Sequence, residues 1–350
     1  MDSLSGEKMT QEKIAFVTGA TGLLGNNLVR LLLSEGYQVK ALVRSAQKAA
    51  EQFEGLEKDR LELVVGDLAS VQGFAAALRG CGVLFHTAAY FRESYKGGRH
   101  SDALHKTNVE GTQALLNEAY AAGIRRMVHI SSIAVLSRSP AGLTDETMTL
   151  ARDAAPDDYY RSKIETDEVV YAFLDRHPDM HISLILPGWM HGPGDLGPTS
   201  AGQFAQDYLQ RKIPGIADAA FSVVDARDVA HVALASSRTG KRGERYLAAG
   251  HPVSMAKLLQ VMEAVTGIPA PRRKLPRALL YAIAFLQEAY ARLTGRPVLL
   301  SLATVNNMAN DYGRRFSADK IRMEFDLGFR PMEETLTDEV MWIRQRAMRG

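Results

Sequence analysis

Short apolar runs alternate with stretches of helical spacing along the first half of the chain. Six of these runs have the length and composition of buried strands. They are Ile14–Val17, Gln38–Val43, Leu61–Val65, Val83–Thr87, Met127–Ile130 and Ile182–Leu186. The runs return at intervals of roughly 20 to 40 residues, which is the spacing of strands that are joined by helices. The pattern therefore predicts an α/β fold with a doubly wound parallel sheet.

The first run leads through a glycine turn into a helix. Gly19, Gly22 and Gly25 follow one another at three-residue spacing, and leucines then recur at helical positions as far as Leu32. A strand that turns sharply into a helix directs the free N–H groups of that helix toward whatever lies above the turn, and these groups favour an anion such as a pyrophosphate. A Cβ would hold the backbone away from the ligand, so glycine is needed. The alternative is a glycine turn that binds nothing, and the strand before it and the helix after it disfavour that reading.

The glycine turn makes the predicted sheet a dinucleotide-binding, or Rossmann, domain. The contacts expected at the turn are Gly19, Thr21, Gly22, Leu23, Leu24 and Gly25. After Gly188 the alternation ends: 189–198 is rich in glycine and proline and predicts a loop, and helical patterns dominate from Pro252. A short strand and a helix at 222–230 are expected to return to the main sheet. We predict a Rossmann domain of residues 12–188 and 221–250, and a smaller, mostly helical substrate domain of residues 189–220 and 251–348.

The tip of the second strand carries a cation where NAD-binding proteins carry an acid. A carboxylate at this tip binds the ribose 2′-hydroxyl of NAD, whereas an arginine accommodates the 2′-phosphate of NADP. Here the tip is Arg44, with Lys48 close behind it, and no carboxylate lies between Gln38 and Ala50. The sequence therefore favours NADP, the alternative being that Arg44 is a solvated surface residue.

The next two strand tips also carry residues suited to a cofactor. Asp67, followed by Leu68, could cap the next helix or accept a hydrogen bond from the adenine amine. The small pair Ala88 and Ala89 follows the fourth strand and allows a ligand to lie close over the sheet. His86 within that strand is expected to be a packed, hydrogen-bonded histidine rather than a catalyst.

A tyrosine and a lysine four residues apart supply the candidate chemistry. On a helix, Tyr159 and Lys163 share one face. A nearby ammonium is expected to lower the pKa of the tyrosine below its usual value of about 10 and make it a usable proton donor or acceptor. The fifth strand delivers Ser131 and Ser132 at its end, and Ser132 can hydrogen-bond a carbonyl oxygen. A Tyr–Lys pair at this spacing is weak evidence of catalysis on its own, because helices produce it by chance. Its position after a glycine turn and strand-end serines makes the evidence stronger.

Composition and charge limit the other possibilities. The chain has 350 residues, of which 46% are hydrophobic and 23% charged, and a formal net charge of +2, too small to indicate nucleic acid or an anionic membrane as the main partner. Cys81 is the one cysteine, so no intrachain disulfide can form, which fits a cytoplasmic location. The polar N-terminus lacks the apolar segment of a signal peptide. The apolar stretch Ala278–Leu286 is too short to span a bilayer, so we expect a buried or subunit-interface helix there, with a shallow membrane contact as the alternative.

These motifs resemble those of the extended short-chain dehydrogenase/reductases. The resemblance rests on Thr18–Gly25, His86–Ala89, Asn108–Thr112, Ser131–Ser132 and Tyr159–Lys163, and more loosely on Phe316–Lys320 and Leu327–Pro331. Val135-Leu136-Ser137 and Ile185-Leu186-Pro187 stand where sugar-nucleotide epimerases usually have Val-Tyr-Gly and Leu-Arg-Pro. The Leu-Pro pair is similar to dihydroflavonol reductase-like members, which reduce ketones or aldehydes with NADPH.

The resemblance implies an NADP-dependent reductase of a small-molecule ketone or aldehyde. It implies that Tyr159 donates the proton, that Ser132 orients the carbonyl oxygen, and that Lys163 holds the nicotinamide ribose and tunes Tyr159. The further cofactor contacts that it implies are Ser131, Pro187, Gly188 and Met190, and the substrate wall is expected at Phe91, Tyr160 and Trp189. No metal is expected, and a homodimer is common in proteins of this kind.

Two other functions remain open at this point. One is a sugar-nucleotide epimerase or dehydratase, which would hold its cofactor tightly and show no net cofactor turnover. The other is a non-catalytic NADP-sensing protein, although such relatives typically lose the Tyr–Lys pair that this chain retains.

Overall fold

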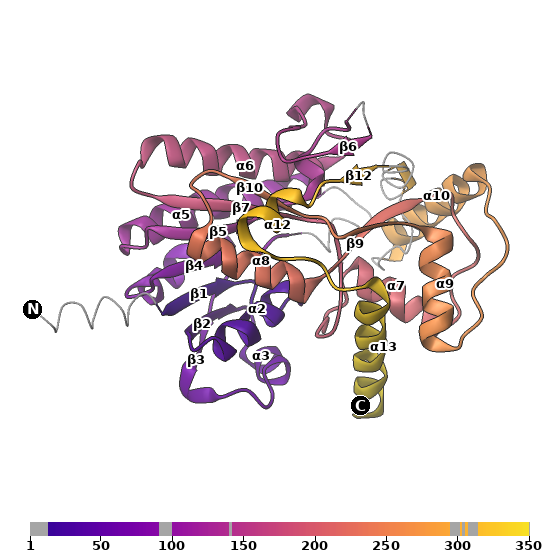
Figure 1. The fold of residues 1–350 in the computed structure, drawn as a ribbon, viewed down its shortest axis with the longest axis horizontal. Coiled ribbons are helices and arrows are strands. Elements are labelled where there is room, and N and C mark those ends of the chain that lie inside the picture. The colour runs from indigo at the N-terminus through magenta and orange to yellow at the C-terminus, as the bar shows by residue number, and fades with distance from the viewer. Residues whose placement is uncertain are drawn as a thin grey trace, which may run out of the picture.

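The centre of the fold is a seven-stranded sheet in the order β10-β7-β5-β4-β1-β2-β3, and every pairing in it is parallel (Figure 1). The computed structural model describes residues 13–90, 100–139, 142–294, 302, 305–306 and 314–349. The strands are β1 (Ile14–Thr18), β2 (Gln38–Val43), β3 (Leu61–Val65), β4 (Val83–His86), β5 (Arg126–Ile130), β7 (His181–Pro187) and β10 (Arg245–Ala248). The doubly wound parallel sheet that the apolar runs predict is confirmed.

Helices cover both faces of this sheet and produce two hydrophobic cores. On one face α2 (Leu23–Ser34) packs against α8 (Ala226–Thr239), with α3 (Ala46–Gln52) and α12 (Asp319–Phe325) beside them. On the other face lie α5 (Gly111–Ala121) and α6 (Asp158–Arg176). The shorter helices are α4 (Ser101–Leu104), the π-helical η5 (His105–Glu110) and the 3₁₀ turns η1 (Lys58–Arg60), η2 (Leu68–Gly73), η3 (Ala75–Leu78), η6 (Ile133–Val135) and η7 (Arg152–Ala154). Apolar residues at helical spacing are therefore buried on the sheet, as the pattern indicates.

A second, smaller body follows β7. Its three-stranded sheet, in the order β11-β9-β8, contains β8 (Trp189–His191), β9 (Ala220–Asp225) and β11 (His251–Ser254). A third hydrophobic core joins it to α7 (Ser200–Leu209), α9 (Met255–Thr266), α10 (Arg277–Thr294) and α13 (Met332–Arg349). A two-stranded pair, β6 (Leu143–Thr144) with β12 (Arg315–Phe316), lies apart from both sheets.

Two expectations for this region are wrong in detail. The segment 189–198 is not wholly a loop, because Trp189–His191 pairs with β9. The strand at 222–225 belongs to the small sheet, and only the helix after it returns to the main one. A three-residue strand such as β8, which precedes a stretch of glycines and prolines, has no periodicity of its own and forms only because a partner strand is present. The sequence of β9 shows a strand but not which sheet it joins, because that depends on its partners β8 and β11.

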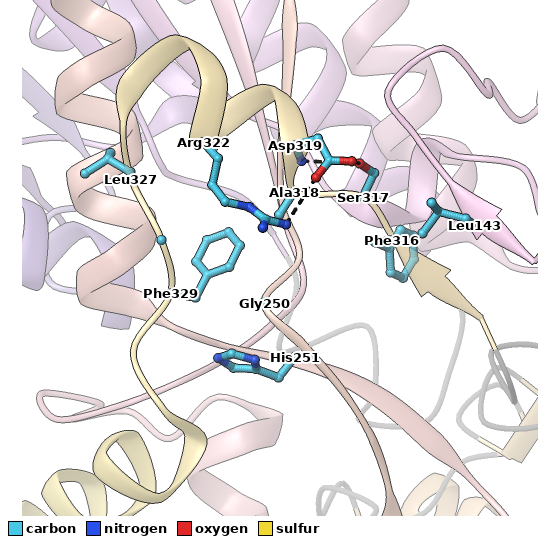
Figure 2. A pocket seen from close by; sticks show the side chains of 11 residues that line it. Leu143, Gly250, His251, Phe316, Ser317, Ala318, Asp319, Arg322, Leu327 and Phe329 are labelled. Carbon is cyan, nitrogen blue, oxygen red and sulfur yellow. Dashed lines mark hydrogen bonds and ion pairs between the residues drawn. The ribbon is translucent and has the colours of Figure 1, made fainter.

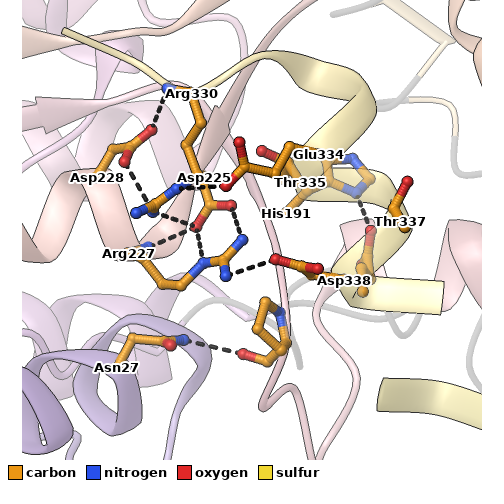
Figure 3. Close-up of polar contacts among 12 residues, drawn as sticks. Asn27, His191, Asp225, Arg227, Asp228, Arg330, Glu334, Thr335, Thr337 and Asp338 are labelled. Carbon is orange, nitrogen blue, oxygen red and sulfur yellow. Dashed lines mark hydrogen bonds and ion pairs between the residues drawn. The ribbon is translucent and has the colours of Figure 1, made fainter. Parts of the chain in front are cut away.

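Ion pairs fasten the C-terminal helix to the small sheet (Figure 3). Arg227 bridges Asp225 at 2.7 Å and Asp338 on α13 at 2.6 Å. In the same region His191 Nδ1 lies 2.8 Å from Glu339 Oε2, and both side chains are fully buried. β8, which carries Trp189, is thereby held against the end of the chain. Within the described ranges, no helix combines the length and the apolar character needed to cross a membrane.

Candidate active site

The glycine turn leaves room at positions where a Cβ atom would clash with the backbone. Gly19 has a positive φ of 63°, and a Cβ there would lie 2.8 Å from the backbone N and Cα of Ala88. A Cβ on Gly25 would lie 2.2 Å from the Gly19 carbonyl oxygen. Gly22 is the N-cap of α2 and provides no side-chain cap, so the first N–H groups of the helix have no side-chain acceptor at this position. These features fit a dinucleotide, whose pyrophosphate the turn and the helix N-terminus would hold.

A buried polar network supports the turn from below. His86 bonds Thr18 Oγ1 through Nδ1 at 2.8 Å and Thr112 Oγ1 through Nε2 at 2.9 Å. The Ala88 N–H in turn donates to Thr18 Oγ1 at 3.2 Å. Burial, with a smaller contribution from the charge of Lys163, lowers the pKa of His86 to about 3, so this histidine is neutral. The prediction of a packed, hydrogen-bonded histidine is confirmed.

The residues predicted to contact the adenosine end of the cofactor follow the strands β2, β3 and β4, and they differ in exposure. Arg44 and Lys48 are exposed, and Arg44 directly follows the last residue of β2, the neighbour of β1. Asp67 Oδ1 accepts the Ala69 N–H at 2.9 Å and caps η2, so the capping role that the sequence allowed is confirmed. Ala89 is exposed, Ala88 is partly exposed, and Leu68 is buried.

The three predicted catalytic residues meet at the carboxyl end of β5. Ser132 follows that strand and hydrogen-bonds the Tyr159 phenol, which lies in the first turn of α6 and is partly exposed. Lys163 is one turn further along the helix, 5% exposed, and its Nζ donates to the Ile130 carbonyl oxygen at 3.1 Å. The neighbouring Ser131 is buried. The fold therefore brings together Ser132 and Tyr159, which lie 27 positions apart in the sequence.

The expectation that the pKa of Tyr159 is lowered is wrong: the surrounding protein groups raise it. Burial raises the pKa of Tyr159 above its ordinary value, the Asp157 carboxylate adds to this, and the hydrogen bond from Ser132 opposes it. Lys163 is not among the groups that shift this pKa, and its ammonium donates to the Ile130 carbonyl oxygen. The phenol therefore keeps its proton at neutral pH, which suits a proton donor.

Behind Lys163 lies a buried charge cluster that the sequence analysis missed. Asp167 Oδ1 is 3.7 Å from His129 Nε2, and Asp167 Oδ2 is 3.4 Å from Arg245 Nη2 on β10. Burial raises the pKa of Asp167 to about 6, against Arg245, Ser131 and Lys163, which lower it. Burial lowers the pKa of Lys163 to about 8, and the Asp167 carboxylate opposes that shift. The four-residue spacing of Lys163 and Asp167 is the one feature of the sequence that indicates an interaction between them. It distinguishes this pair from an ordinary surface pair only once both side chains are known to be buried.

Replacing Asp167 with asparagine should shift the alkaline limb of the activity profile. The carboxylate raises the pKa of Lys163, so its removal lets burial lower that pKa further below about 8. Lys163 then loses its charge at a lower pH, and the alkaline limb of kcat/KM should move to lower pH. A pH series of kcat/KM for the wild type and D167N measures this shift. Glu168→Gln, which removes an exposed carboxylate one residue away, should leave the limb in place. An unmoved limb in D167N would contradict this role.

A second missed residue fixes the backbone beside the site. Asn108 Oδ1 accepts the Tyr90 N–H at 2.7 Å, and its Nδ2 donates to the Tyr90 carbonyl at 3.1 Å and to Ser162 Oγ at 3.2 Å. Asn108 thus joins the segment after β4 to α6 next to Lys163. The sequence marked it only as part of a motif, since an asparagine shows its partners only in three dimensions.

The residues predicted for the nicotinamide end lie at the junction of the two bodies. Pro187 ends β7, and a Cβ on Gly188 would lie 2.5 Å from the Ala249 and Ser222 carbonyl oxygens. Met190 packs against the core that contains α2. Trp189 packs against His191, Phe204 and Phe221, with ring centroids 4.5, 5.5 and 4.6 Å away. Tyr160 meets the Tyr159 ring edge-on at 6.2 Å. Phe91 lies outside the described residues.

A pocket of about 480 Å³ opens near the C-terminal segment (Figure 2). Its lining includes Gly250, His251, Phe316, Arg322 and Phe329, and none of the three predicted catalytic residues belongs to it. Figure 2 shows Arg322 directed toward Asp319, to which it is paired at 3.1 Å. The pocket is therefore a feature separate from the Ser132–Tyr159 pair.

Known proteins resemble nearly the whole chain. Residues 15–249 match the model of the NAD dependent epimerase/dehydratase family. Sterol demethylase protein B of Methylococcus capsulatus is 34% identical over 337 residues, which cover 95% of this chain and 98% of that protein. A putative dihydroflavonol 4-reductase of Synechocystis sp. is 31% identical over 334 residues, which cover 94% of each. Among solved structures, gox2253 has a TM-score of 0.78 at 30% identity and covers 95% of this chain and 98% of its own.

Proposed function

The chain belongs to the NAD dependent epimerase/dehydratase family, the resemblance that its motifs already indicate, and we propose that it is an NADPH-dependent reductase of a ketone or aldehyde. The observation that carries the proposal is the hydrogen bond between Ser132 and a Tyr159 phenol that keeps its proton at neutral pH. A relative described as a putative dihydroflavonol 4-reductase supports reduction over epimerisation.

Tyr159 is the proton donor in this proposal. Its raised pKa keeps the proton on the phenol until a carbonyl oxygen gains negative charge beside it. Ser132 offers a second hydroxyl at the same place and would hold that oxygen by a hydrogen bond. A dinucleotide whose pyrophosphate is held by the turn with Gly19 and Gly25 would supply the hydride from its reduced nicotinamide.

Lys163 contributes a buried positive charge to the same site. Its pKa of about 8 leaves it cationic at neutral pH, and the Ile130 carbonyl and the Asp167 carboxylate hold its side chain in place. A cation there favours the negative charge that develops on a reacting carbonyl oxygen and would bind the hydroxyls of the nicotinamide ribose. Asp167 acts through Lys163 and is therefore a positioning residue.

The choice of NADPH rests on Arg44 and Lys48. Both are exposed at the end of β2, and the Ser45 hydroxyl between them is engaged in capping α3 through the Lys48 N–H at 3.4 Å. A guanidinium binds a phosphate through paired hydrogen bonds, and it offers no acceptor to the ribose hydroxyl that NAD carries there.

Replacing Arg44 with aspartate should reverse the cofactor preference. The variant removes the partner of the 2′-phosphate and adds a like charge, so we expect KM for NADPH to rise by about 10²-fold and KM for NADH to fall. The ratio of kcat/KM for the two cofactors measures the effect. Arg79→Asp, a charge reversal at another exposed arginine of the sheet domain, serves as the matched control. An equal preference in wild type and R44D would contradict the assignment.

The substrate is proposed to be an apolar carbonyl compound. Tyr160 presents aromatic surface beside the Tyr159 ring, and Trp189, which follows the end of β7, packs with Phe204 and Phe221 in a second aromatic group. The names of two relatives refer to a sterol and a flavonol, which agrees with a bulky apolar ligand. A panel of aldehydes and ketones assayed with NADPH and NADH in parallel tests the proposed function. Consumption of NADPH with an apolar member of the panel is expected, and a protein inert with the panel but active on sugar nucleotides would contradict it.

A further inference from the structure

The solvent-facing side of α10 is apolar along its length. Leu279, Leu286, Tyr290 and Leu293 lie at positions i, i+7, i+11 and i+14 and form one stripe on the helix. Leu286 is 66% exposed and Leu293 is 86% exposed, and Phe285 beside them is 64% exposed. Six of the twelve large apolar side chains exposed among the described residues belong to this one helix. Exposed apolar surface concentrated in this way marks an interaction site.

The other side of α10 is already used. Leu280, Ala284 and Ala291 are buried in the third hydrophobic core, against α9 and α13. A helix that is apolar all round is normally buried completely, yet α10 leaves its second apolar side in solvent. Figure 1 shows α10 at the end of the molecule that lies away from the seven-stranded sheet. With respect to the residues that the structure describes, the stripe remains exposed and can contact an extended surface.

A basic segment leads directly into this helix. Residues 271–277 contain Arg272, Arg273, Lys274 and Arg277, all exposed, and no acidic residue occurs between Glu263 and Glu288. Arg272 forms an ion pair with Glu263 at 3.2 Å, and Arg277 forms one with Asp218 at 3.5 Å. Arg273 and Lys274 form no ion pair with any residue in the described part of the chain. The local charge is thus strongly positive although the chain as a whole is nearly neutral.

The positive charge of residues 271–277 indicates which kind of partner covers the exposed apolar side of α10. Pairing of this stripe with a second copy would offer the basic segment at most Glu288 as an anionic partner from the helix it leads into, because no acidic residue occurs between Glu263 and Glu288. In a parallel pair the two basic segments would also repel each other. An anionic bilayer offers apolar chains to the stripe and negative head groups to the basic segment. We propose that α10 and residues 271–277 form a peripheral membrane-binding surface, with α10 lying in the interface of an anionic lipid bilayer.

Vesicle flotation of the full chain tests this surface. We expect the protein to float with vesicles of phosphatidylcholine and phosphatidylglycerol, to stay behind with phosphatidylcholine alone, and to be released from the anionic vesicles by salt. The double variants Phe285→Ser with Leu286→Ser, and Arg273→Glu with Lys274→Glu, should each reduce the bound-to-free ratio at least about tenfold. All four side chains are exposed, so the thermal unfolding midpoint should not change.

Matched control variants distinguish binding through this surface from nonspecific binding to vesicles. Met323→Ser removes an equally exposed apolar side chain from α12, and Lys58→Glu with Arg79→Glu makes the same charge change at exposed positions of the sheet domain. Both controls should bind anionic vesicles like the wild type. The proposal is overturned if the wild type does not float with anionic vesicles or if the α10 variants float as well as the controls. It is equally overturned if the protein is a dimer that ignores vesicles and that Phe285→Ser with Leu286→Ser converts to monomers.

Discussion

Replacing Tyr159 with phenylalanine should lower the rate of carbonyl reduction by about 10²- to 10⁴-fold while NADPH affinity stays near that of the wild type. The substitution removes the only atom through which this side chain can give a proton, and leaves the ring to fill its place. Ser132 loses a hydrogen-bond partner but keeps its bond to the Ala134 N–H at 3.1 Å. Steady-state assays with a reactive aldehyde, together with NADPH titration by fluorescence, separate turnover from binding.

Tyr160→Phe is the matched control for this experiment. It removes a hydroxyl from the next residue on the same helix, whose ring contacts Tyr159 edge-on. This variant should retain most of the activity. Full activity in Y159F, or an equal loss in both variants, would show that Tyr159 is not the proton donor.

Replacing Gly25 with alanine should weaken cofactor binding strongly. The added methyl would lie 2.2 Å from the Gly19 carbonyl oxygen and 2.8 Å from Ala20 Cα, and these backbone atoms can yield only if the turn or α2 moves. Overpacking of this kind costs roughly 1–3 kcal/mol of folding free energy. Since the turn is the proposed pyrophosphate site, NADPH affinity should fall by about 10²-fold or more. Fluorescence titration with NADPH and thermal unfolding measure the two effects.

Gly73→Ala controls for the loss of a glycine as such. A methyl at this position would meet only Ser70 Oγ, at 3.9 Å, so binding and stability should remain close to wild type. Wild-type NADPH affinity in G25A would contradict the pyrophosphate site assigned to the glycine turn.

The parallel sheet could be predicted because its strands are buried on both faces. Such strands appear as continuous apolar runs, and the run at Gln38–Val43 matches β2 from end to end. The run at Leu61–Val65 also matches β3 from end to end, although β3 is the edge strand and only Val64 in it is buried. The glycine turn and the strand-end serines were visible for a related reason: each lies next to a strand that the pattern identifies. Tyr159 and Lys163 needed only the local geometry of a helix.

Features that depend on distant partners could not be predicted in the same way. His191 and Glu339 form a buried pair across 148 residues, and nothing near either one signals the other. The cluster around Asp167 joins β5, α6 and β10, and the direction of the Tyr159 pKa depends on how deeply these elements bury it. The sequence of α10 also could not distinguish a buried helix, a subunit interface and a membrane contact, since an apolar sequence is the same whichever of them covers it. In the single chain Leu280 and Ala284 are buried, whereas Phe285 and Leu286 are exposed.

Transfer of deuterium to the product from NADPH that carries deuterium at both C4 positions is the most direct test of the central claim. The protein would be incubated with the labelled cofactor and the best carbonyl substrate, and the product examined by mass spectrometry. A reductase with Tyr159 as proton donor predicts an alcohol that carries deuterium on the former carbonyl carbon, formed in equal amount to NADP⁺. A product without deuterium, or an isomerised sugar nucleotide formed while NADPH is not consumed, would contradict the account.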